Sequence, residues 1–74
     1  MKMLIKEFAE FTGVSVRTLR YYDEIGLLPP ACVDGQTGYR YYDEDSLIRM
    51  QEVLFYRELD FSLRAIREIL SSPN

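Results

Sequence analysis

Two short helical patterns, separated by a short turn that contains one glycine, restrict the fold of this 74-residue chain more than any other feature. Ile5, Phe8, Ala9 and Thr12 recur three and four positions apart, which is the spacing of one face of a helix. Gly13 follows at once and can adopt the left-handed conformation that ends a helix. The pattern predicts a first helix over 5–12 that ends in a tight turn.

A second helix is predicted to begin after that turn. Ser15 is a good N-cap, because its hydroxyl can accept a hydrogen bond from the backbone N–H of Arg17 or Thr18. The helix runs on from Val16 until Gly26 stops it, so about three residues separate the two helices. Two helices that cross this closely around a turn are the physical requirement of a helix-turn-helix that reads DNA.

The second helix has one apolar side and one polar side. On a helical wheel, Val16, Leu19 and Tyr22 fall on one side, and Arg17, Arg20, Tyr21 and Glu24 fall on the other. Arginine can donate two hydrogen bonds to guanine or to phosphate, and tyrosine adds a hydroxyl that reaches phosphate. The unpaired N–H groups at the helix start, Ser15 to Arg17, favour an anion. The outward side therefore predicts a contact surface for double-stranded DNA.

Plainer interpretations of the same side chains stay open. Arg20 and Glu24 are four residues apart and can form an ion pair on the helix surface, whereas Arg17 has no acid at that spacing. We expect Tyr22 to lie partly in the core with only its hydroxyl available, and Tyr21 to project outward.

A β-hairpin is predicted between the second helix and the rest of the chain. Pro29 and Pro30 break the helix, and turn residues then surround positions 34–38. The following stretch 39–42 alternates, so Tyr39 and Tyr41 share one side and Arg40 shares the other with Tyr42.

Two more helices complete the chain. Asp43 is a natural N-cap for a helix that extends to about Leu59, and Ser62 caps a last helix that ends at 71–73. Their expected apolar faces are Leu47, Met50, Val53 and Leu54, and then Leu63, Ile66, Ile69 and Leu70. The predicted class is mostly α, with four helices and one small β-hairpin in a single domain over 1–74.

Composition excludes several kinds of protein. The chain has no histidine and one cysteine, Cys32, which excludes an internal disulfide framework and leaves no ligand set for a metal, so we expect no cofactor. No nucleophile and base can be combined without histidine, so an enzyme is not expected. The net charge is −3, but five basic and five acidic residues balance up to Tyr42, and the acidic excess lies beyond it. No run is apolar enough for a membrane span, which makes the cytoplasm the expected compartment.

Three stretches together resemble the N-terminal DNA-binding domain of MerR-family transcription regulators: IKEFAEFTGVSVRTLRYYDEIGLLPP, GYRYYDEDSL and RELDFSLRAIREIL. They match in order and spacing over nearly the whole chain, and they look closest to the multidrug-responsive and thiostrepton-responsive members. The resemblance implies a winged helix-turn-helix, in which the hairpin is the wing, followed by a second helix pair. It also implies a homodimer formed by a later coiled coil, a C-terminal effector domain, and promoter DNA that is bent and untwisted so that RNA polymerase can engage.

The resemblance also assigns contacts to DNA. By position, the recognition-helix contacts are Arg17, Thr18, Arg20, Tyr21 and Tyr22, the wing contacts are Tyr39 and Arg40, and Arg57 is a weaker candidate for a flanking phosphate. With the helix start at Ser15, these nine residues are the expected DNA-binding set.

Some positions depart from the family pattern. Leu4 stands where Ser or Thr often caps the first helix, and Asp60 stands where glycine commonly ends the third, each at some cost in stability. The wing between Pro30 and Gly38 has no Lys or Arg, so we expect weaker phosphate affinity there. The chain ends at Asn74 before any coiled coil or effector domain, which favours an excised DNA-binding module.

Two other functions remain open on the sequence. One is an excisionase-like architectural protein, which bends DNA with a similar short winged module. The other is a helical protein-interaction module whose tyrosines and arginines form a protein hot spot. Arg57, Arg64 and Arg67 are on most proteins solubilising surface charges, and Arg64 with Glu68 is an expected ion pair.

Overall fold

The computed structural model describes residues 1–72, which form four helices and three short strands. In chain order the elements are β1 (Met3–Leu4), α1 (Ile5–Thr12), α2 (Val16–Glu24), β2 (Cys32–Val33), β3 (Arg40–Tyr42), α3 (Glu44–Glu58) and α4 (Leu63–Ser71). The four predicted helices and the hairpin are confirmed, while the expected helix end at Pro73 and the chain end at Asn74 lie outside the described residues. None of the helices within residues 1–72 has both the length and the apolar character needed to cross a membrane.

The turn between α1 and α2 forms as the sequence predicts. Gly13 adopts a left-handed conformation with φ of 78°, and its N–H donates to the Ala9 carbonyl at 2.9 Å. Ser15 Oγ accepts from the N–H of Thr18 at 3.1 Å and so begins α2. At the start of α1, where Leu4 cannot cap with its side chain, Glu7 Oε1 accepts from the Leu4 N–H at 2.9 Å. The two helices therefore cross around a turn of three residues.

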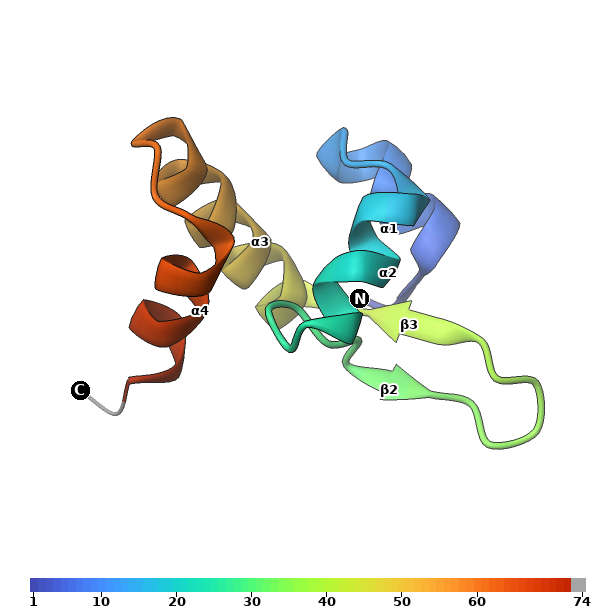
Figure 1. Cartoon of the computed structure of the whole chain (residues 1–74). Coiled ribbons are helices and arrows are strands. Elements are labelled where there is room, and N and C mark those ends of the chain that lie inside the picture. Colours follow the sequence, from blue (N-terminus) through green and yellow to red (C-terminus); the bar gives the residue numbers. More distant parts are fainter. Residues whose placement is uncertain (73–74) are drawn as a thin grey trace.

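The sheet has one strand more than the sequence predicted. The order is β1-β3-β2 and both pairs are antiparallel, with Leu4 opposite Tyr41 on one side and Cys32 opposite Tyr41 on the other. The expected hairpin was a two-stranded ribbon, which is marginal on its own. Pairing with β1 makes β3 the central strand and joins the base of the wing to the start of α1. Figure 1 shows the hairpin loop extending away from the helices.

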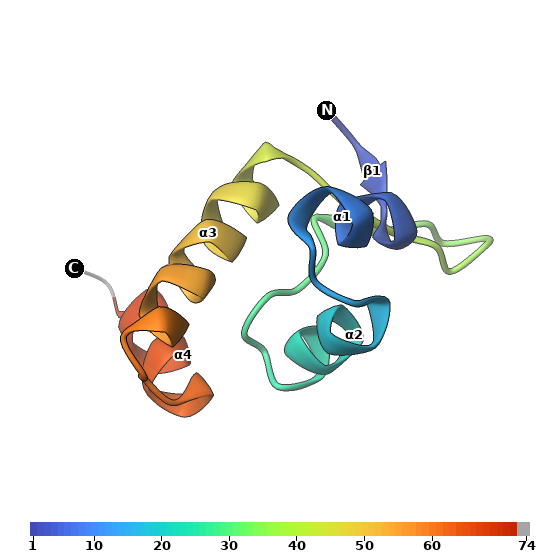
Figure 2. The ribbon, with the colours of Figure 1, turned by 90° about the horizontal axis from the view of Figure 1, so that it is seen from above.

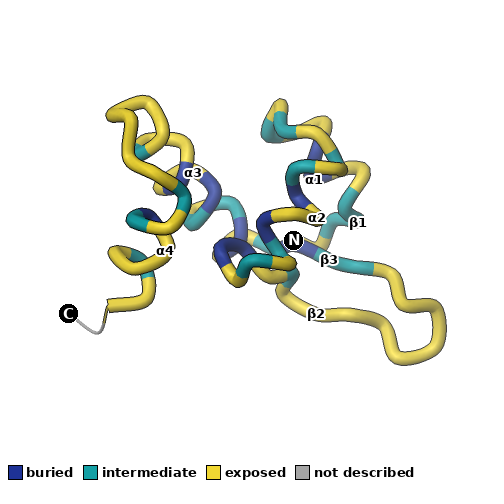
Figure 3. The backbone as a smooth tube through the Cα atoms, in the orientation of Figure 1, coloured by how far each residue is buried: buried dark blue, intermediate teal, exposed yellow. Residues whose placement is uncertain are grey.

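The core lies where the inward sides of the helices meet β3. Phe8 of α1 stacks on Tyr42 of β3 with ring centroids 4.6 Å apart, and both side chains are fully buried. Leu19 and Tyr22 of α2 are also buried, which confirms the core side predicted for that helix. The remaining large core residues are Leu27, Leu28, Met50, Val53 and Ile66. Figure 3 shows the buried positions on the facing sides of the elements, with the wing loop exposed throughout.

The α3 and α4 helices pack against each other beside the helix-turn-helix (Figure 2). The predicted apolar faces of these helices are only partly buried. Leu54 and Ile69 were expected to be covered, but they are 39% and 38% exposed, because Met50, Val53 and Ile66 already fill the contact between these helices and the core. The turn between the two helices contains Asp60 in a left-handed conformation with φ of 66°, at the position where the sequence departs from glycine.

Candidate nucleic-acid interface

The polar side of α2 is open to solvent. Arg17, Arg20 and Tyr21 are exposed, whereas Leu19 and Tyr22 point into the core, so the predicted two-sided character of the helix is confirmed. The alternative ion pair between Arg20 and Glu24 is not formed, and no ion pair within residues 1–72 involves Arg17 or Arg20. Both guanidinium groups therefore keep their donors available to an external acceptor.

The start of α2 is held by two hydroxyl side chains. Ser15 Oγ donates to Thr18 Oγ1 at 2.9 Å and accepts from the Thr18 N–H at 3.1 Å. The backbone N–H groups of Val16 and Arg17 lie in the first turn of the helix, where N–H groups have no intrahelical acceptor. Together with the positive end of the helix dipole, these N–H groups make the start of α2 favourable for an anion.

The wing strand meets the far end of the same helix. Arg40 Nε donates to Asp23 Oδ2 at 3.1 Å, and the two side chains are 33% and 26% exposed. Tyr39, one residue earlier, is exposed by 56%. The sequence predicted Tyr39 and Arg40 on opposite sides of the strand, and their different exposure agrees with that prediction. The sequence did not predict that Arg40 would have an acidic partner 17 positions away.

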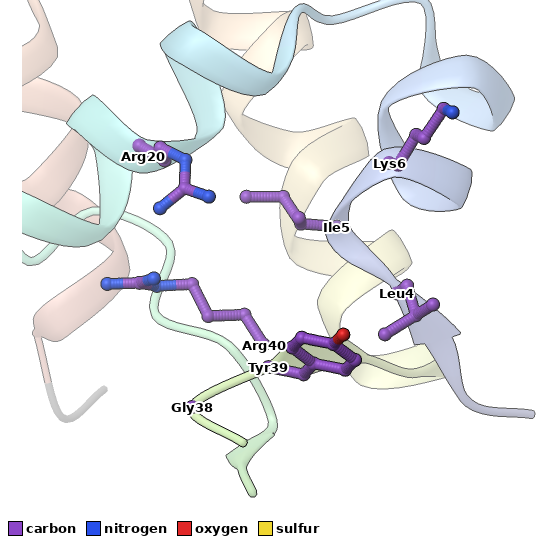
Figure 4. Close-up of a pocket in the computed structure, with 7 residues that line it drawn as sticks. All are labelled: Leu4, Ile5, Lys6, Arg20, Gly38, Tyr39 and Arg40. Atoms are coloured by element: carbon purple, nitrogen blue, oxygen red, sulfur yellow. The ribbon is translucent and has the colours of Figure 1, made fainter.

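A cleft of about 300 Å³ is lined by residues of α1, α2 and the wing. We call it the wing cleft, and it is lined by Leu4, Ile5, Lys6, Arg20, Gly38, Tyr39 and Arg40. Figure 4 shows the Arg20 side chain extending from α2 toward the Arg40 side chain, while the Lys6 amine points away from both arginines.

The wing cleft brings together three of the predicted site residues, Arg20, Tyr39 and Arg40, and adds Lys6. Sequence reasoning missed Lys6, because a lysine on the polar side of α1 carries no signal of its own. The Arg20 and Arg40 guanidinium groups and the apolar side chains of Leu4 and Ile5 line the same cleft, and they match a sugar-phosphate backbone, which has anionic phosphates and apolar sugar faces.

The tip of the wing is negatively charged. The Asp34 carboxylate accepts from the backbone N–H groups of Thr37 and Gln36 at 3.0 and 2.7 Å, and these bonds hold the pKa of that carboxyl below its usual value. The hairpin turn is thus organised around a charged carboxylate. Because this charge repels phosphate, weak phosphate affinity between Pro30 and Gly38 stays a prediction.

The arginines of α3 and α4 have structural partners. Arg57 Nη1 donates to the Phe61 carbonyl at 2.9 Å in the turn between α3 and α4, so the structure does not bring this predicted phosphate contact into the wing cleft. Arg67 is exposed, as expected of a surface charge, and its Nη1 also donates to the Ile25 carbonyl at 2.8 Å, just after α2. Arg64 and Glu68 form the expected ion pair at 3.8 Å.

No group suited to metal binding gathers in the part of the chain that the structure describes. Within residues 1–72, no three Cys, Asp or Glu side chains come close enough together to hold a metal ion. The charged groups of the wing cleft are cations, which repel metal ions and attract anions.

Known proteins share this arrangement of helices and wing. The HTH-type transcriptional regulator SkgA of Caulobacter vibrioides is 49% identical over 69 residues, which are 93% of this chain and 27% of SkgA. The crystal structure of MtaN, the N-terminus of the Bacillus subtilis multidrug transporter activator, superposes with a TM-score of 0.91 at 44% identity and covers 97% of this chain and 67% of MtaN. HiNmlR, a MerR family regulator crystallised bound to promoter DNA, superposes with a TM-score of 0.85 at 30% identity over 93% of this chain and 54% of HiNmlR.

The family match extends over almost the whole chain. Residues 3–73 match the family described as MerR HTH family regulatory protein. This match and the superpositions confirm the winged helix-turn-helix fold and the resemblance carried by the three sequence stretches. The chain therefore belongs to the MerR family of helix-turn-helix regulatory proteins.

Proposed function

We propose that this chain binds double-stranded promoter DNA with sequence preference, through a face formed by α2 and the wing. The observation that carries the proposal is the wing cleft. There Arg20 of the helix and Tyr39 and Arg40 of the wing, which lie far apart in sequence, line one cationic hollow beside an exposed helix. This is the surface that a duplex requires if a helix enters its major groove while a wing follows the neighbouring backbone.

Each predicted site residue has a role in this proposal. Arg17, Arg20 and Tyr21 are exposed on α2 and are placed to reach base edges or phosphates. Ser15 and Thr18 fix the helix start at which a phosphate is favoured. The other residues are proposed to contact the sugar-phosphate backbone of the DNA: Tyr22 through its hydroxyl, Tyr39 and Arg40 from the wing, and Arg57 at a flanking phosphate.

We infer that residues 1–74 are the DNA-binding module of a larger, dimeric transcription activator. The chain spans 27% of SkgA, and MtaN is described as the N-terminus of an activator. By family resemblance, a later coiled coil forms the homodimer and a C-terminal domain senses an effector. In the cytoplasm, the dimer bends and untwists promoter DNA so that RNA polymerase can engage. The sequence-dependent cost of that distortion would add to specificity.

The known relatives favour this proposal over the two alternatives. SkgA is named a transcriptional regulator and HiNmlR is bound to promoter DNA, whereas neither description points to an excisionase or a protein-interaction module. Duplex binding separates the proposal from only one of the alternatives. A protein-interaction module does not bind duplex even at low salt, whereas an excisionase-like protein also binds and bends it.

Selection from a random duplex library tests the proposal. The wild-type chain is mixed with duplexes of about 30 base pairs with random centres, which are long enough for two half-sites one helical turn apart, and bound molecules are sequenced over several rounds. We expect a common sequence to emerge, and we expect that Arg17→Ala or Arg20→Ala selects a broader set. Failure of the wild-type chain to enrich any sequence would contradict sequence-specific binding.

A further inference from the structure

The ion pair between Arg40 and Asp23 joins the wing to the helix that the proposed function places in the groove. It connects β3 with the last turn of α2 through one bond of 3.1 Å, across 17 positions of sequence. About a third of Arg40 and a quarter of Asp23 are exposed, so the pair is partly shielded from solvent and salt. It is the shortest ion pair between two side chains within residues 1–72.

Asp23 occupies a position where its charge is locally unfavourable. It lies in the last turn of α2, at the negative end of the helix dipole, and Glu24 follows it with no basic residue in that turn. It also places a negative charge on a helix that the proposal directs toward polyanionic DNA. Both effects oppose a carboxylate here, so the ion pair with Arg40 is the interaction that offsets them.

The Arg40 end of the pair belongs to a strand that enters the core. Tyr42, next but one to Arg40 on β3, is fully buried and stacks on Phe8. Burial raises the pKa of the Tyr42 phenol, and the Asp23 carboxylate raises it further, while Arg40 lowers it. The Tyr42 phenol therefore lies within electrostatic reach of both members of the ion pair.

Arg40 keeps donors for a second partner. Its Nε is used by Asp23, and no hydrogen bond within residues 1–72 uses its two terminal Nη groups. Arg40 lines the wing cleft, into which Arg20 also extends (Figure 4). A guanidinium held by its Nε presents its outer edge in a fixed direction, which reduces the conformational entropy lost when that edge binds a phosphate.

We propose that Asp23 is a positioning residue for DNA recognition: it holds Arg40, and with it the wing, at a fixed place relative to α2. The proposal rests on the proposed DNA-binding function and adds a residue that does not itself contact DNA. An acidic residue on the DNA-binding face is thereby required for specific binding, although its charge repels the ligand.

Substitution of Asp23 by asparagine separates positioning from simple repulsion. If Asp23 acts only through long-range electrostatics, removing its negative charge raises the affinity for every duplex. Phosphate contacts from a correctly placed wing fix the register of α2 on its preferred duplex. If Asp23 positions the wing, Asp23→Asn therefore lowers affinity for the duplex enriched by the wild-type chain relative to a scrambled duplex of equal length and composition. We expect the ratio of the affinities for the enriched and the scrambled duplex to fall about fivefold, which corresponds to the loss of one partly exposed ion pair.

Glu24→Gln is the matched control, because it removes the same charge from the next residue, which is exposed and has no ion pair within residues 1–72. We expect Glu24→Gln to raise affinity for both duplexes alike and leave their ratio unchanged. If Asp23→Asn also leaves the ratio unchanged, the positioning role is overturned while DNA binding stands. If the wild-type chain binds neither duplex, the proposed function itself fails.

A double-mutant cycle shows whether Asp23 acts through Arg40. We expect Asp23→Asn to have no further effect on the ratio in the Arg40→Gln background, and additive losses would contradict the link. Residual dipolar couplings of the free protein give a readout that does not depend on DNA. They should show a less fixed orientation of the hairpin relative to α2 in Asp23→Asn but not in Glu24→Gln, and identical couplings in wild type and Asp23→Asn would overturn the proposal.

Discussion

Arg49 Nε donates to the backbone carbonyl of Leu27 at 2.7 Å, which fastens α3 to the turn that follows α2. Arg67 Nη1 makes the corresponding bond from α4 to the Ile25 carbonyl at 2.8 Å. Carbonyls at the end of a helix lack intrahelical donors, and arginine side chains are suited to satisfy them. The second helix pair thus holds the C-terminal end of α2, while Ser15 holds its start.

Loss of the Arg49 bond should weaken the whole domain. Arg49 is half-buried, and Arg49→Met keeps much of its apolar length while leaving the Leu27 carbonyl without this donor. We expect the free energy of unfolding in urea to fall by about 1 to 3 kcal/mol, the scale of a hydrogen bond to a charged group. Arg64→Ala is the control, because its ion pair is exposed and should contribute less than about 1 kcal/mol. Equal effects of the two substitutions would contradict a structural role for Arg49.

The N-cap of α2 should contribute measurably to stability. Ser15→Ala removes the acceptor for the Thr18 N–H, and we expect a loss of about 1 kcal/mol in the free energy of unfolding. Ser15→Asn keeps a side-chain acceptor and should stay close to wild type. The cap is not important for stability if alanine and asparagine at this position unfold at the same urea concentration.

The left-handed conformation of Asp60 offers a stabilising substitution. Its φ of 66° is costly for a residue with a Cβ, so Asp60→Gly should raise the free energy of unfolding by up to about 1 kcal/mol. Asp60→Ala also removes the charge but keeps the Cβ, and it should not stabilise. An equal rise of the melting temperature in both variants would show that the charge, not the backbone, limits stability here.

The Asp43 N-cap of α3 should make the free energy of unfolding decrease in acid. The backbone N–H of Ser46 donates to Asp43 Oδ1 at 3.1 Å and holds the pKa of the Asp43 carboxyl below its usual value of 3.8. Because the folded-state pKa is the lower one, the charged form favours folding. This contribution is full above about pH 4 and is lost as the pH falls through the folded-state value.

Asp43→Asn tests this dependence, since asparagine keeps a cap but does not titrate. We expect the difference in unfolding free energy between wild type and Asp43→Asn to shrink as the pH falls from about 4 to about 2. A difference that stays constant over that range would mean that Asp43 does not contribute through its charge.

Local signals in the sequence predicted most of the fold. Gly13, Ser15, Asp43 and Ser62 lie at helix ends, and each acts through neighbours within four positions, so the four helices could be placed from the chain alone. The wing turn was equally local. The pairing of β1 with β3 could not be predicted, because two residues are too short to show an alternating pattern and their partner lies almost 40 positions away.

The candidate site was predictable only in part, for the same reason. The outward side of α2 follows from helical geometry, so the exposure of Arg17, Arg20 and Tyr21 was predicted. The partners of Arg40 and Arg67 depend on how distant elements pack. A sequence pattern carries no information on which carbonyl or carboxylate such long side chains will reach.

Fluorescence-anisotropy titration of the enriched duplex over a salt series, with wild type, Arg20→Ala and Arg64→Ala, tests most directly whether the exposed side of α2 binds DNA. We expect wild-type affinity to fall steeply as salt rises, and Arg20→Ala to cost about 1 to 3 kcal/mol, while Arg64→Ala, which also removes one positive charge, stays near wild type. Binding that does not respond to salt, or an Arg20→Ala variant that binds like wild type, would show that these arginines are ordinary surface charges and that the DNA-binding face lies elsewhere.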